Sequence, residues 1–212
     1  MAKRDVTRSS KEGDSLAAIG RTLRLHGYVL VVFLGLMWAE EIVDLFMGGR
    51  LDAFGIRPRT AEGLVGIFLA PFLHGGFGHL IANTPFFLLL GWLVLARETW
   101  HFFAVSLGVT ILGGLGVWLF GAGNSVHIGA SGMIFGYLGY LMLGGFFERR
   151  LVTMFGSVVV AFLFGGLLWQ VLPGIPGVSW EGHLFGFLGG VVMAWALARR
   201  AGKTSARPKK SA

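Results

Sequence analysis

Six long runs of apolar residues follow one another along the chain, separated by shorter polar or glycine-rich stretches. They cover about residues 25–47, 79–96, 100–120, 131–147, 151–171 and 180–198. Each run is close to the ~20 residues that an α-helix needs to cross the hydrocarbon core of a bilayer. The pattern predicts an all-α membrane protein built as a bundle of six transmembrane helices.

The two ends of the chain differ from this pattern. Residues 1–24 are polar and basic without a sustained apolar period, which predicts a tail that is at least partly disordered. Residues 200–212 form a second basic tail of low complexity. Residues 25–199 are then one helical domain. No small-residue cleavage site follows the first apolar run, so we expect the first helix to be retained.

The connection between the first two runs, residues 48–78, is long and contains an apolar stretch at 63–73. This stretch is too short to span a bilayer, and Pro71 interrupts it. We expect it to lie in the membrane rather than across it. A plain external loop is the alternative.

Composition agrees with a membrane protein and indicates its orientation. Hydrophobic residues make up 54% of the chain, charged residues 14%, and the mean hydropathy is +0.70. The net charge is +7, but the lysines and arginines form no basic stripe interleaved with aromatic residues, so we expect no nucleic-acid partner. Fifteen lysines and arginines fall in the tails and alternate connections, against three on the opposite side. The positive-inside rule then predicts cytoplasmic termini, and a compact chain of this kind suits a bacterial plasma membrane.

Three acidic residues, Glu40, Glu41 and Asp44, gather on one face in the second half of the first run. Acids are costly in mid-bilayer and often mark proton or ion relays. The alternative is that they lie near the outer interface and pair with the arginines that follow, which are Arg50, Arg57 and Arg59.

Ser131 lies between Gly129 and Gly132, where a polar loop turns into the fourth apolar run. A serine at a helix N-terminus, flanked by glycines that have no side chain to block close approach, is a candidate nucleophile once a base and oxyanion donors accompany it. The chain has no cysteine, which excludes a cysteine nucleophile and a thiolate metal site.

His183, at the start of the sixth run, is the candidate base. With Gly186 and Gly190 it forms a stripe at i, i+3 and i+7, which can pack on the glycines of the fourth run and bring His183 towards Ser131. No acid is placed to orient the imidazole, so a dyad is favoured over a triad. Phe135, one turn after Ser131, is spaced to orient the ring by packing.

The second run begins with His79 and Asn83, which are i and i+4 and therefore share a helix face. These two side chains and the Ser131 backbone N–H are candidate donors for an oxyanion. His74 precedes the helix and is either functional or a loop residue. His127 is interpreted as loop structure.

These motifs resemble those of the rhomboid family of intramembrane serine proteases. The matching residues are Gly129, Ser131 and Gly132; His74, His79 and Asn83; and Gly182, His183, Gly186 and Gly190. The resemblance covers roughly residues 25–199. It implies a six-helix bundle with a water-filled site that opens outward, a membrane-embedded first loop, a Ser131 and His183 dyad, and an oxyanion hole at His79 and Asn83.

The resemblance also implies substrates that are transmembrane proteins of the same bilayer, with no cofactor and no metal. The chain departs from the family in two places. Phe135 stands where many members have a tyrosine that stacks on the catalytic histidine, and we expect activity to survive this change. The Trp-Arg pair common in the first loop is replaced by Arg57-Pro58-Arg59, so the fold of that loop is less closely implied.

Three other classes compete with this interpretation. A metal-dependent hydrolase would use His74, His79, His127 and His183, but the spacing lacks a His-Glu-x-x-His pattern. An inactive rhomboid-like protein that binds transmembrane clients is expected to have lost the serine or the histidine. A transporter would show inverted repeats or interrupted segments, and none stands out.

Overall fold

The computed structural model describes residues 2–205, with side chains for residues 15–201, and its regular elements are all helical. They are α1 (Ala2–Met47), η1 (Leu51–Phe54), α2 (Ala61–Leu69), α3 (Phe77–Arg97), α4 (Thr99–Phe120), α5 (Ser131–Glu148), α6 (Leu151–Phe164), η2 (Gly165–Val171) and α7 (Trp180–Ser205). Here η marks a 3₁₀ helix. In the described part of the chain there is no strand, only an isolated β-bridge between Ile56 and His127.

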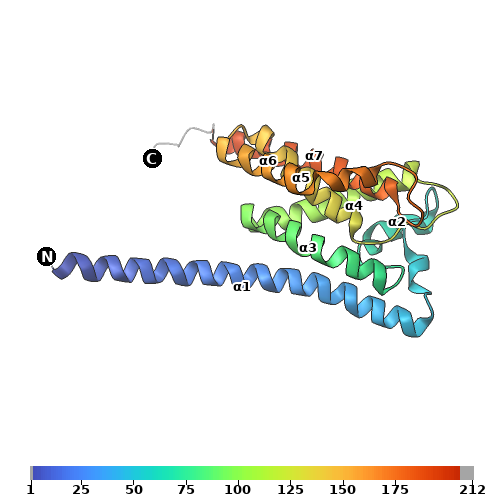
Figure 1. The fold of residues 1–212 in the computed structure, drawn as a ribbon, viewed down its shortest axis with the longest axis horizontal. Helices are drawn as coiled ribbons and strands as arrows, with labels where there is room; N and C mark the ends of the chain where they lie inside the picture. Colours follow the sequence, from blue (N-terminus) through green and yellow to red (C-terminus); the bar gives the residue numbers. More distant parts are fainter. Residues whose placement is uncertain (1, 206–212) are drawn as a thin grey trace.

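The helix α5 is the centre of the bundle. It packs against α3, α4, α6 and α7, and residues 133–141 are all buried. Figure 1 shows α1 along one side of the molecule, next to α3, with α5, α6 and α7 on the other side. The short helix α2 and the loops before α5 and α7 gather at the end of the bundle opposite the start of α1 and the end of α7. Ser131 and His183 begin their helices at this loop end.

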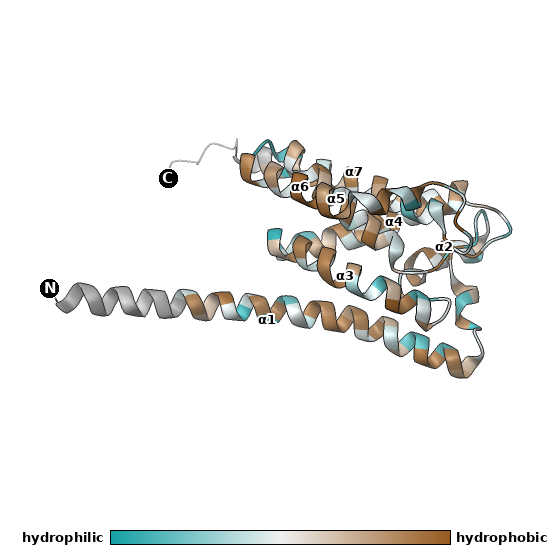
Figure 2. Cartoon of the chain, viewed as in Figure 1, coloured by the Kyte–Doolittle hydropathy of each residue, from teal (hydrophilic) through white to brown (hydrophobic). Residues whose placement is uncertain are grey.

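Within the described residues, four helical segments are long and apolar enough to cross a membrane. They are Phe77–Arg97, Thr99–Phe120, Leu151–Val171 and Trp180–Ala201. Figure 2 shows hydrophobic residues along the helices and hydrophilic ones mainly in the connections at both ends of the bundle. An all-helical membrane protein is therefore confirmed, whereas six spans and a first loop inside the membrane remain predictions.

The first helix is longer than the sequence pattern indicates. We expected a tail before about residue 25 that is at least partly disordered, whereas α1 is helical from Ala2 onward. Residues 2–24 contain no proline, so no backbone group is missing from the helical hydrogen-bond ladder. The predicted second tail lies partly in α7, which continues to Ser205, and partly outside the described residues.

The first connection folds around α2, which is only nine residues long and is capped at its start by Thr60. In the part of the chain that the structure describes, Arg59 pairs with no acid. Its guanidinium donates to the main-chain oxygens of Leu119 at 3.0 Å and Gly121 at 2.9 Å. Asp44 instead accepts from the Leu51 N–H at 2.7 Å.

Among the described residues, no ion pair joins these α1 acids to any of the three arginines, so the expected pairing with one of them is wrong. An arginine close to a helix end can satisfy the carbonyls that have no intrahelical partner there. Arg59 binds such carbonyl oxygens at the end of α4. The sequence does not show that an arginine will bind main-chain oxygens instead of an acid.

The glycines of α5 and α7 meet as their spacing predicts. A Cβ added at Gly186 would collide with the Gly132 carbonyl oxygen, and one at Gly190 with the carbonyl oxygen of Gly136. The two backbones are therefore in direct contact over two turns. This contact places the first turns of α5 and α7 side by side, and with them Ser131 and His183.

Candidate active site

Ser131 is the first residue of α5, and three neighbouring elements hold the loop before it. The Gly129 N–H donates to the Ala70 carbonyl oxygen at 2.8 Å, and the Ala130 N–H donates to His74 Nε2 at 3.3 Å. Gly129 has φ +110°, and a Cβ there would meet the His79 ring at 2.6 Å. Only glycine suits both the backbone angle and the close approach. The loop is thereby fixed from α2, from the segment before α3 and from α3 itself.

His183 is buried, and two contacts fix its ring. The imidazole stacks on the Phe135 ring with centroids 4.1 Å apart and planes 9° from parallel. Its Nδ1 lies 3.0 Å from the main-chain oxygen of Gln170 in η2. A carbonyl oxygen only accepts, so Nδ1 carries the hydrogen. In the neutral ring Nε2 is then left with a free lone pair, which is the form a general base needs.

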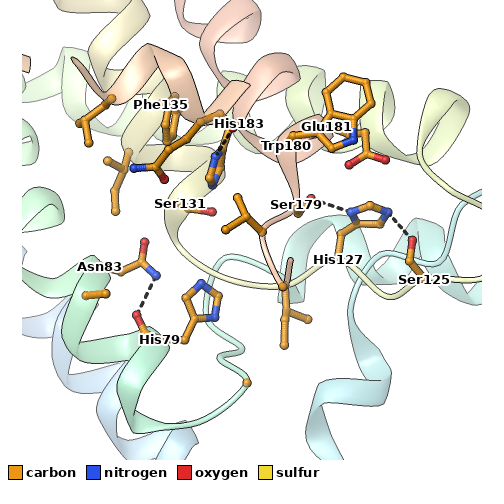
Figure 3. Close-up of a pocket in the computed structure, with 18 of the residues that line it drawn as sticks. His79, Asn83, Ser125, His127, Ser131, Phe135, Ser179, Trp180, Glu181 and His183 are labelled. Carbon is orange, nitrogen blue, oxygen red and sulfur yellow. Dashed lines mark hydrogen bonds between the residues drawn. The ribbon is translucent and has the colours of Figure 1, made fainter. Parts of the chain in front are cut away.

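Figure 3 shows the His183 ring between Phe135 and the Ser131 hydroxyl, with the edge opposite the Gln170 contact turned towards Ser131. Among the described residues, no hydrogen bond joins Ser131 to His183. Hydrogen bonds of this kind are often long in the absence of substrate and tighten in the complex. The arrangement therefore has the elements of a serine and histidine pair in an unliganded geometry.

His79 and Asn83 both come from the first half of α3 and face the same space as Ser131 (Figure 3). One amide hydrogen of Asn83 is donated to the His79 carbonyl oxygen at 2.9 Å. Among the described residues, the second amide hydrogen has no acceptor, so it is available to a ligand in the cavity that Asn83 lines. The first N–H groups of α5 have no intrahelical partner, so donors from two helices converge near the serine hydroxyl.

These side chains line a cavity of about 750 Å³. Its lining includes His79, Asn83, Ser131, Phe135 and His183, and it also takes in the loops that precede α5 and α7. A cavity of this volume, with these polar groups in its wall, is large enough to hold several water molecules. The structure thus brings the candidate nucleophile, base and donors to one cavity at the loop end of the bundle.

His74 lies beside this cavity rather than in it. It is fully buried, with its ring centroid 5.2 Å from that of His79. Its Nδ1 donates to the Phe72 carbonyl oxygen at 3.1 Å, and its Nε2 accepts from the Ala130 N–H. Both ring nitrogens are thus satisfied in the neutral form, and burial lowers the pKa of His74 to about 4. The residue supports the backbone in front of Ser131 without carrying a charge.

Sequence reasoning missed two groups at this site. The Gln170 carbonyl orients His183, but a main-chain acceptor leaves no trace in residue type. Ser179 accepts from the Gly182 N–H at 3.1 Å and caps the start of α7. This second group had a signal, because serine just before an apolar helical run is a typical N-cap.

Within the described residues, no group of three or more histidines, cysteines or acids is arranged to hold a metal ion. Three of the four histidines of the metal-hydrolase alternative instead have separate hydrogen-bond partners. His74 bonds Ala130 and His183 bonds Gln170, while His127 bonds two serines, Ser125 and Ser179.

Comparison with known proteins adds an independent observation. A family model described as the Rhomboid domain matches residues 61–200. The chain is 40% identical over 200 residues to the "Uncharacterized protein Rv1337" of Mycobacterium tuberculosis, with 86% of this chain and 83% of that protein covered. It is 39% identical over 188 residues to the "Uncharacterized protein ML1171" of Mycobacterium leprae, covering 85% and 74%.

A more distant similarity carries a functional name. The "Putative rhomboid protease YdcA" of Bacillus subtilis is 28% identical over 130 residues, with 60% of this chain and 64% of that protein covered.

Proposed function

Since the chain belongs to the rhomboid family, we propose that this integral membrane protein is a serine endopeptidase that cleaves peptide bonds in or next to transmembrane segments of other membrane proteins. One observation carries the proposal. Ser131 and His183 line the same cavity, and the His183 Nδ1 hydrogen bond leaves Nε2 as the basic nitrogen. Family membership alone would not distinguish an active enzyme from an inactive relative.

In the proposed reaction, the Ser131 oxygen attacks the carbonyl carbon of the scissile peptide while His183 Nε2 takes the hydroxyl proton. The C–N bond then breaks as the imidazolium gives this proton to the leaving amine. The acyl group remains on Ser131 as an ester. Nε2 next takes a proton from water, the resulting hydroxide attacks the ester, and the Ser131 hydroxyl is restored as the second product leaves.

The tetrahedral intermediates of this reaction carry a negative oxygen. We assign its stabilisation to the Ser131 N–H, to the free amide hydrogen of Asn83 and to His79, which line the space on the side of Ser131 away from His183 (Figure 3). Removing one such donor typically costs about 100- to 1,000-fold in rate. His74 and Gly129 hold this arrangement in place through the backbone before the serine.

The proposal includes an orientation. We place both termini in the cytoplasm of a bacterium and open the cavity to the outer side of its plasma membrane, with six spans and with α2 lying in the bilayer. The supporting argument is the excess of lysine and arginine at the end opposite the loops. Because the chain has no cysteine, single cysteines can test it. A membrane-impermeant maleimide should label Gly123→Cys on intact cells, and labelling only after lysis would reverse the orientation.

The reaction itself is tested with a fluorophosphonate probe on the detergent-solubilised protein. Wild type should be labelled, and peptide mass should place the label on Ser131. Ser131→Ala and His183→Ala should both remain folded and unlabelled, and Ser131→Ala should fail to cleave a transmembrane substrate. Strong chelators should leave wild-type labelling unchanged. A folded wild type that neither labels nor cleaves would favour an inactive protein that binds transmembrane clients.

A further inference from the structure

A third histidine lines the cavity besides His79 and His183. His127, four residues before Ser131, lies with its Nδ1 2.6 Å from the hydroxyl oxygen of Ser179, which is four residues before His183. Its Nε2 lies 2.8 Å from the hydroxyl oxygen of Ser125 (Figure 3). One side chain therefore joins the loop that leads into the serine helix to the start of the histidine helix.

The directions of these hydrogen bonds follow from the partners. The Ser125 hydroxyl donates to the Ala122 carbonyl oxygen at 2.7 Å, so its oxygen is left to accept from His127 Nε2–H. In the neutral ring Nδ1 then accepts from the Ser179 hydroxyl. The Ser179 oxygen in turn accepts from the Gly182 N–H. Each of the three side chains, Ser125, His127 and Ser179, thus donates one hydrogen bond and accepts one.

The surroundings agree with a neutral ring. His127 is buried, and burial lowers the pKa of the imidazole below its usual value, while Glu181 at the start of α7 acts in the opposite direction. Arg59 reaches the start of the same loop, where its guanidinium is held by the carbonyl oxygens of Leu119 and Gly121. The fully paired neutral form is therefore the state in which His127 joins the two segments.

The backbone of His127 is anchored independently of its side chain. Its N–H and carbonyl oxygen pair with Ile56 at 2.9 and 3.0 Å. Ser179, the partner of His127, is anchored to α7 in two ways. Its hydroxyl caps the helix, and its main-chain carbonyl oxygen accepts from the His183 N–H at 3.2 Å. No regular element lies between η2 and Trp180. The side-chain bond from His127 to Ser179 is thus a direct link between an anchored loop and the first turn of α7.

We propose that His127 is a positioning residue, which fixes the His183 helix start relative to the Ser131 loop through its hydrogen bond to Ser179. This rests on the proposed function, because the distance it sets matters only if Ser131 and His183 react together. A displacement of about 1 Å between reacting groups can cost on the order of 100-fold in rate.

Two substitutions at His127 separate its two bonds. The amide oxygen of asparagine occupies the place of Nδ1, so His127→Asn can still accept from Ser179. Glutamine reaches the place of Nε2, so His127→Gln keeps only the bond to Ser125. The fluorophosphonate labelling rate of Ser131 should stay within about threefold of wild type for asparagine and fall at least tenfold for glutamine. Melting temperatures verify that both variants are folded.

Ser179 supplies a second matched pair. Threonine and glycine are both accepted at a helix N-cap, but only Ser179→Thr keeps a hydroxyl that can donate to His127. Labelling should be retained by threonine and reduced by glycine. The double variant His127→Gln/Ser179→Gly should be no slower than the worse single variant, because both changes remove the same bond.

Amide hydrogen exchange tests the link without relying on catalysis. Exchange at residues 121–130 and 177–184 should accelerate together in His127→Gln and stay near wild type in His127→Asn. This outcome is expected even if wild type proves not to label, which would overturn only the proposed function. Unchanged exchange and labelling in a folded His127→Gln, or equal losses in the Asn and Gln variants, would overturn the positioning role. A label on Ser179 instead of Ser131 would do so as well.

Discussion

Phe135 and His183 come from different helices, and their rings lie face to face, 4.1 Å apart at the centroids and 9° from parallel. Phe135 is on α5 one turn after Ser131, so the helix that carries the proposed nucleophile also supports the base. The hydrogen bond from His183 Nδ1 to Gln170 fixes the rotation of the ring in its plane, and the stack fixes the plane itself.

We expect the ring of Phe135, rather than any polar group, to be what the site requires. Phe135→Tyr should keep the fluorophosphonate labelling rate within a few fold of wild type. Phe135→Ala should reduce it about 10- to 100-fold, because the imidazole loses its aromatic partner and gains freedom to tilt. Equal rates for the alanine and tyrosine variants would show that the stack does not position His183.

Gly186→Val should damage folding as well as activity. A side chain at this position would run into the Gly132 main chain and force α5 and α7 apart. We expect a loss of several degrees in melting temperature and little labelling of Ser131. Gly189→Ala is the matched control on the same helix, since a Cβ there meets its neighbours at 3.5 Å, an ordinary contact distance. A Gly186→Val variant as stable as this control would contradict the close packing.

Gly129→Ala should clearly lower the fluorophosphonate labelling rate of Ser131 and have a smaller effect on the melting temperature. The new methyl group would have to sit at φ +110° and against the His79 ring, at a strain cost of about 1–3 kcal/mol. The ring or the loop must then move, and both belong to the proposed oxyanion site. Gly78→Ala, whose Cβ would meet nothing within 4 Å, provides the comparison. Melting curves and labelling rates are measured for both variants, and a Gly129→Ala variant that is labelled as fast as Gly78→Ala would contradict the prediction.

His74 makes stability depend on pH in a defined window. Its pKa is lowered to about 4 in the folded protein, against ~6.5 for a free histidine. Between these values the unfolded chain binds a proton that the folded chain does not, so the free energy of unfolding decreases as pH falls from about 6.5 to 4. The full difference is roughly 3 kcal/mol, and it is absent above pH 7.

The variant His74→Gln isolates this contribution. Its amide oxygen can accept from the Ala130 N–H in place of Nε2, and it does not titrate. Melting temperatures in detergent between pH 4 and 8 should therefore fall less steeply in the variant than in wild type. Parallel curves would mean that other groups cause the acid sensitivity.

Much of the site follows from helical spacing. The i, i+4 relation of His79 and Asn83 and the glycine stripe below His183 depend only on the period of an α-helix, which the sequence displays directly. The packing of Gly186 against Gly132 then brings the ends of two helices together. The roles of these residues in catalysis remain predictions until they are measured.

The path of the loops could not be obtained in this way. The bond between His127 and Ser179 joins residues 52 positions apart, and it depends on how two irregular segments approach each other. Arg59 was expected to meet an acid, but it binds main-chain oxygens at the end of α4. Main-chain groups are the same at every position, so residue types do not reveal which of them will be used.

The acceptor that orients His183 is such a main-chain group, the carbonyl oxygen of Gln170. A carboxylate in its place would have to stay ionised among apolar helices, at a cost of several kcal/mol unless fully paired, whereas a peptide carbonyl brings no charge. Every amino acid at position 170 would also supply the same oxygen. A single base change in the gene could therefore replace the glutamine side chain but could not delete the partner of the histidine, so natural variation at this position should be tolerated as long as the turn of η2 is kept.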